Sequence, residues 1–103
     1  MIKIRNIEMV NNNSSLKVTF LSDTKITEKE LDEVLKKIAL IQQSHFHDLG
    51  CDIDKPQITK LNEHTFQMIT QLKPRKDKKI IDWKINELSR KIFQGFPGNK
   101  EKV

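Results

Sequence analysis

Apolar and polar side chains alternate in two short stretches at the start of the chain. Over residues 2–10 the alternation shifts by one position at Asn6, which is typical of a strand that contains a bulge. Residues 11–15 are short polar side chains that favour a turn. A second alternation over residues 16–20 follows, so this part of the chain predicts a β-hairpin.

After Ile26 the apolar residues change from the alternating spacing of a strand to the spacing of a helix. Thr27 and Glu30 have the spacing of a capping box, and Ile26 and Leu31 flank it as a hydrophobic staple. Gly50 is placed to end the helix that they start. The buried side of this helix is predicted to carry Leu31, Val34, Leu35, Ile38, Ile41, His45, Phe46 and Leu49.

The second half repeats the order of the first, about fifty positions later. After a linker over residues 51–56, short strands are expected at 58–61 and 66–72, joined by a turn at 62–64. Asp77 is the expected cap of a second helix, which ends at residues 95–98. Its buried stripe is predicted to be Ile81, Ile85, Leu88 and Ile92.

These patterns predict one α+β domain over residues 1–98, with residues 99–103 as a flexible C-terminal tail. The expected architecture is a small two-layer sandwich in ββαββα order. Two amphipathic helices would cover one face of a four-stranded, mainly antiparallel sheet. A chain of 103 residues is long enough for one such core.

Charge is distributed unevenly along the chain. The whole chain carries a formal charge of +5. Residues 1–52 have seven basic and eight acidic side chains, whereas residues 53–103 have twelve basic and six acidic ones. Such asymmetry is compatible with an anionic partner, although lysine-rich surfaces also serve solubility alone.

The sequence predicts a protein that is not an enzyme and that uses no cofactor or metal. It contains no glycine-rich phosphate loop, no GxSxG and no HExxH. His45 and His47 lie two positions apart on the expected helix and therefore point to different sides, which disfavours a shared metal. Cys51 is the single cysteine and has acidic neighbours in sequence, so a structural thiol in a reducing, cytoplasmic location is expected.

The connection before the second helix is strongly basic and is the candidate site for an anion or a nucleic acid. It leads into a helix N-terminus, where main-chain N–H groups favour phosphate. The chain has few aromatic side chains for base stacking, and a solvated loop explains the same residues. The candidate residues are Lys73, Arg75, Lys76, Lys78, Lys79, Lys84 and Lys91.

A protein-facing surface is the other candidate. Trp83 is expected on the side of the second helix opposite its buried stripe, near Lys79 and Arg90, and Leu40 lies opposite the stripe of the first helix. Tryptophan and arginine are enriched where proteins bind one another. Phe93, Phe96 and Pro97 could instead fold over the indole. The uncovered sheet face, with Lys17, Thr19, Gln67, Ile69 and Gln71, and the sheet edges could also hold a partner or a second copy.

The favoured hypothesis is therefore a small binding module that acts through protein–protein contacts, as an adaptor, inhibitor or assembly factor. The alternative is a nucleic-acid-binding accessory protein that uses the basic second half. A membrane partner is not expected, because no apolar run reaches the roughly 18 residues that span a bilayer.

Overall fold

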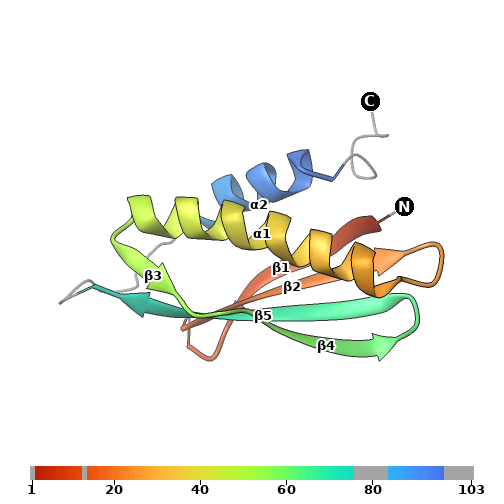
Figure 1. Cartoon of the computed structure of the whole chain (residues 1–103). Coiled ribbons are helices and arrows are strands. Elements are labelled where there is room, and N and C mark those ends of the chain that lie inside the picture. The colour runs from red at the N-terminus through yellow and green to blue at the C-terminus, as the bar shows by residue number, and fades with distance from the viewer. Residues whose placement is uncertain (1, 13, 76–83, 97–103) are drawn as a thin grey trace.

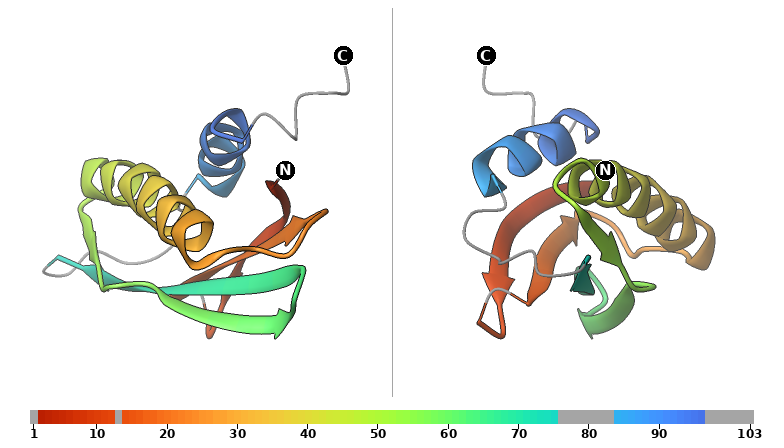
Figure 2. Two further views of the ribbon diagram at one scale, coloured as in Figure 1. Left: turned by 45° about the vertical axis from the view of Figure 1, so that its right-hand side comes forward. Right: turned by 90° about the vertical axis from the view of Figure 1, so that its left-hand side faces the viewer.

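Five strands form one antiparallel sheet, and two helices lie against one of its faces (Figures 1 and 2). The computed structural model describes residues 2–12, 14–75 and 84–96. Within them the chain is a small compact α+β domain. Its elements are β1 (Ile2–Val10), β2 (Ser15–Ser22), α1 (Glu28–Asp48), β3 (Cys51–Ile53), β4 (Gln57–Asn62), β5 (Thr65–Pro74) and α2 (Ile85–Gln94).

The sheet is built around the β2–β5 pair. β1 lies outside β2, and β3 and β4 pair with successive lengths of β5 on its other side. In Figure 1, β3 and β4 run one after the other along β5. The bulge expected near Asn6 is confirmed, because the β1–β2 register shifts between Ile4 and Asn6.

The prediction of four strands in ββαββα order was wrong in detail, because the expected linker over residues 51–56 contains β3. Cys51, Asp52 and Ile53 pair with the end of β5, and the N–H of Asp54 donates to the Gln71 carbonyl at 2.9 Å. Pro56 follows; proline has no N–H for a ladder and favours the end of a strand or a break between strands. One long edge strand is thus divided into β3 and β4.

The core lies between the sheet and the helices. Alternate residues of β2 and β5 point toward the helices, and Phe20 stacks on Phe66 with ring centroids 5.8 Å apart. The shared face predicted for the second hairpin is confirmed, since its four side chains are buried. The buried residues of the two central strands on this side are Leu16, Val18, Phe20, Ser22, Phe66, Met68, Thr70 and Leu72.

Helix α1 begins and ends where the sequence predicts. Glu30 N–H donates to the Thr27 hydroxyl at 3.2 Å, and Thr27 N–H donates to Glu30 Oε1 at 3.0 Å, which completes the capping box. These bonds to Thr27 lower the pKa of Glu30. At the other end Gly50 has φ of 80°, a left-handed conformation that glycine adopts without steric cost.

Helix α2 begins at Ile85, with Lys84 in a left-handed conformation at its N-cap. Leu88 and Ile92 are buried, as the predicted stripe requires, and Phe96 is buried beyond the helix end. The prediction of one helix running from a cap at Asp77 was wrong, because Lys84, which it placed inside the helix, has a left-handed backbone and precedes the first helical residue. Asp77 and the stripe position Ile81 themselves lie outside the described residues. So does the tail expected at residues 99–103.

Candidate binding surface

The outer side of α1 presents an unusually exposed apolar side chain. The helix turns one stripe toward the sheet, with Val34 and Ile38 buried, so that Leu40 points to solvent with 67% of its surface exposed. Leu40 lines a shallow depression with Ile41 and Ser44 of the same helix and Lys91 of α2. One predicted residue of the protein-facing surface is therefore exposed beside the second helix.

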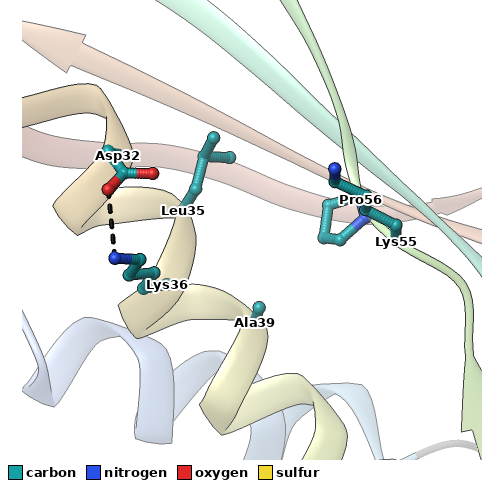
Figure 3. Close-up of a pocket in the computed structure, with 6 residues that line it drawn as sticks. All are labelled: Asp32, Leu35, Lys36, Ala39, Lys55 and Pro56. Carbon is teal, nitrogen blue, oxygen red and sulfur yellow. Dashed lines mark ion pairs between the residues drawn. The ribbon is translucent and has the colours of Figure 1, made fainter. Parts of the chain in front are cut away.

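A second hollow lies on another side of the same helix. Leu35 and Ala39 of α1 and Pro56 of the connection between β3 and β4 line a groove of about 260 Å³ (Figure 3). Polar groups at this groove come from Asp32, Lys36 and Lys55. The Lys36 ammonium lies 3.2 Å from the Asp32 carboxylate one helical turn earlier, so that two of the three charges in the groove neutralise each other.

The first two basic residues of the predicted anion site are engaged in ion pairs. Lys73 Nζ lies 2.8 Å from Asp54 Oδ1. Arg75 donates from Nε and Nη2 to Asp52 Oδ1, at 3.2 and 3.0 Å. Its Nη2 is also 2.6 Å from Nδ1 of His47 at the end of α1. This cluster of charged side chains connects α1, β3 and β5, so Lys73 and Arg75 have a structural role.

These contacts set the proton affinities of the cluster. The hydrogen bond from Arg75 lowers the pKa of Asp52, desolvation opposes this effect, and the charges of Arg75, His47 and Lys73 lower the pKa further. The hydrogen bond to Asp54 raises the pKa of Lys73, and that to Asp52 raises the pKa of Arg75. The Asp52 carboxylate is therefore stabilised in the charged state that binds Arg75.

The two other described basic candidates, Lys84 and Lys91, belong to the N-cap and the last turn of α2. Lys91 lies 3.7 Å from Glu87 and 3.5 Å from His45 Nδ1. Lys84 is the exposed N-cap residue of α2, whose side chain makes no capping hydrogen bond. Arg90 is exposed on α2. Trp83, Lys76, Lys78 and Lys79 lie outside the described residues, so their predicted roles stay predictions.

The potential metal and thiol ligands point in different directions. His45 is 2% exposed and packs edge-on against Phe46, whereas His47 is exposed and contacts Arg75. The buried Cys51 thiol donates to the Asp52 carbonyl at 3.1 Å. Burial raises the pKa of this thiol, and the Asp52 charge adds to the effect. Cys51 thus has the environment of a structural thiol.

Sequence reasoning missed the contacts that depend on long-range topology. The groove residue Lys55 was assigned to a linker, and the partners of Arg75 are 23 and 28 positions away in the chain. Gln42 was also missed: it is fully buried in α1 and its Oε1 accepts from the Thr70 hydroxyl at 2.8 Å. Local periodicity carries no signal for such pairs, since they form only when α1, β3 and β5 come together in the folded chain.

Comparison with protein-family models, with curated proteins and with solved structures finds no significant match. Neither of the two described helices is long and apolar enough to cross a membrane. The class of this chain is thus defined by its own geometry, as a compact α+β domain with a partly apolar helical surface.

Proposed function

We propose that this chain is a non-enzymatic binding module that docks another protein on the outer side of α1. The observation that carries the proposal is Leu40, which is the more exposed of the two large apolar side chains that stand out in the described structure. Its depression between α1 and α2 offers a partner an apolar contact beside Lys91. Adaptor, inhibitor or assembly-factor roles all use such a surface.

Features of the sheet edges support a different protein, and not a second copy, as the partner. β1 has a bulge between Ile4 and Asn6, and β4 has one between Lys60 and Asn62. Lys60 also lies opposite Phe66, which places a charged side chain on the inward face of the outer strand. Bulges and inward charges on outer strands oppose pairing between sheets.

The uncovered sheet face supports the same choice. Figure 2 shows both helices on the other side of the sheet. On the uncovered face Lys17 forms a 3.0 Å ion pair with Glu8, and Thr19 pairs with Gln67 in the strand register. These four side chains are polar, whereas the outer side of α1 presents the exposed, apolar Leu40.

The ion pairs of Lys73 and Arg75 argue against the alternative, a nucleic-acid-binding role. Phosphate would have to displace carboxylates at 2.8 and 3.0 Å from these cations. A mobility-shift assay at low salt tests the alternative directly, because phosphate binding is strongest there. We expect no complex with single- or double-stranded nucleic acid.

A cytoplasmic location belongs to the same proposal. It is supported by Cys51, which is the only cysteine of the chain and hence forms no disulfide within it.

Affinity capture from the native host, with and without nuclease, tests the proposed function. We expect a protein to co-purify whether or not nuclease is added. Leu40→Lys should weaken the binding of this protein by roughly ten-fold, the size of effect expected when a central apolar contact is replaced by a charge. Leu61→Lys is the matched control, because Leu61 is 50% exposed but lies on β4. Equal loss with both variants, or no loss with Leu40→Lys, would contradict the proposal.

A further inference from the structure

We propose that the groove between α1 and residues 54–56 binds a partner segment in which an apolar side chain adjoins a carboxylate. This inference rests on the proposed function and specifies the chemistry of the partner. The groove residues are Asp32, Leu35, Lys36, Ala39, Lys55 and Pro56 (Figure 3).

The wall of the groove selects an apolar side chain. Leu35 and Ala39 stand one turn apart on α1, and Pro56 faces them from the connection between β3 and β4 (Figure 3). All three are only partly buried, so the fold leaves apolar surface here that water covers. A leucine-sized side chain that fills such a hollow removes this surface, and its own, from water.

The positive charge at the rim of the groove favours a partner segment with a carboxylate next to its apolar side chain. Lys36 is paired with Asp32 at 3.2 Å, whereas within the described residues no ion pair or hydrogen bond engages the exposed ammonium of Lys55. Asp54, which precedes Lys55, is itself paired with Lys73 at 2.8 Å. The groove therefore has one excess positive charge, which a carboxylate on the incoming segment neutralises.

The geometry of the connection holds this lysine in place. β3 is anchored to the end of β5 by its ladder and by the bond from Asp54 N–H to the Gln71 carbonyl. β4 resumes pairing with β5 at Gln57. Residues 55 and 56 are thus held at both ends by strand pairing, so the backbone position of Lys55 relative to the groove is fixed before a partner arrives. Preorganisation of this kind lowers the entropic cost of binding.

Titration of the isotope-labelled protein with defined peptides, followed by amide chemical shifts, tests the inference. The probe is a capped pentapeptide of alternating glutamate and leucine. Two controls replace either glutamate by glutamine or leucine by serine. We expect the probe to shift the amides of Leu35, Ala39 and Lys55, and both controls to bind more weakly.

Two variants examine the charge of the groove. Lys55→Glu is expected to lower the affinity for the glutamate–leucine peptide about five-fold, since it removes one exposed attraction and adds a repulsion. Lys60→Glu makes the same charge change on β4, outside the groove, and is expected to alter binding by less than about two-fold. Ala39→Met, which narrows the groove without a charge change, should also lower the affinity for the peptide.

Three results would overturn the inference. They are the absence of shifts at the groove, equal binding of the glutamate–serine peptide, and equal effects of Lys55→Glu and Lys60→Glu. Equal binding of the glutamate–serine peptide would indicate a general anion surface. Because the titration needs no cellular partner, its failure is separate from the Leu40→Lys result. The proposed function fails on its own test, if Leu40→Lys leaves the capture of the partner unchanged or if Leu61→Lys reduces it equally.

Discussion

Val18 and Met68 lie opposite each other in the central strand pair, fifty positions apart in the sequence. β1 lies outside β2 and β4 lies outside β5, so each half of the chain contributes a hairpin that is followed by a helix. The two halves are arranged about this pair. The strand order thus places the two hairpins side by side, whereas the extra strand β3 and the different lengths of α1 and α2 distinguish the two halves.

The central pair should dominate stability. Met68 is fully buried beneath the helices, and Met68→Ala removes its packing and leaves a cavity, at a cost of about 2–5 kcal/mol in the free energy of unfolding. Gln67→Ala is the control, since Gln67 lies on the uncovered face of the same strand; its effect should be within about 0.5 kcal/mol. Urea denaturation measures both. A small effect of Met68→Ala would mean that the helices do not pack on this strand.

The ion pair between Asp52 and Arg75 should give stability a defined pH dependence. The pKa of Asp52 is lowered from its ordinary 3.8 by the Arg75 hydrogen bond, so the folded state binds the Asp52 proton less tightly than the unfolded state does. The stabilisation is therefore fully present above the unfolded pKa and is lost as the pH falls through the lower, folded one.

Asp52→Asn measures this dependence. The variant should be less stable than the wild type at neutral pH. The difference should begin to shrink as the pH falls below the unfolded pKa of about 4, and it should vanish once the pH has passed below the lower folded pKa. Urea denaturation at a series of pH values provides the comparison. Glu63→Gln is a suitable control, because Glu63 forms only an exposed pair with Lys25 at 3.7 Å. A difference that is constant with pH would show that the ion pair does not contribute through Asp52 ionisation.

The helices and strands with clear local signals could be predicted from the sequence. The Thr27–Glu30 capping box sets the start of α1, and Asn6 marks the β1 bulge, since both depend on residues only a few positions apart. β3 was missed because three residues with one charged member show no periodicity. Its pairing depends on β5, about twenty positions later, and no local rule contains that information.

The candidate site was predictable only in part, for the same reason. Leu40 was found because exposure on a helix follows from its angle to the buried stripe. The ion pairs of Lys73 and Arg75 were not found, although Asp52 and Asp54 are acidic residues within the expected linker. Their role becomes visible once β3 brings residues 52 and 54 beside the end of β5. The sequence showed a basic run, and the topology supplied the carboxylates that pair with its first members.

The buried pair of Gln42 and Thr70 links α1 to the central strand and is incompletely satisfied. The Thr70 hydroxyl donates to Gln42 Oε1 at 2.8 Å, while Gln42 Nε2 has no hydrogen-bond partner in the described structure. A buried polar group without a partner costs free energy. The pair therefore contributes one favourable hydrogen bond and one desolvation penalty, and the balance depends on which group is removed.

A double-mutant cycle separates these contributions. Thr70→Val leaves Gln42 Oε1 buried without its donor and should destabilise the protein by about 1–3 kcal/mol. Gln42→Met removes both amide atoms with little change in volume, and the double variant removes the whole polar pair. The double variant should therefore be more stable than Thr70→Val alone and close to the wild type or above it. Strictly additive losses in urea denaturation would show that the hydrogen bond does not couple the two residues.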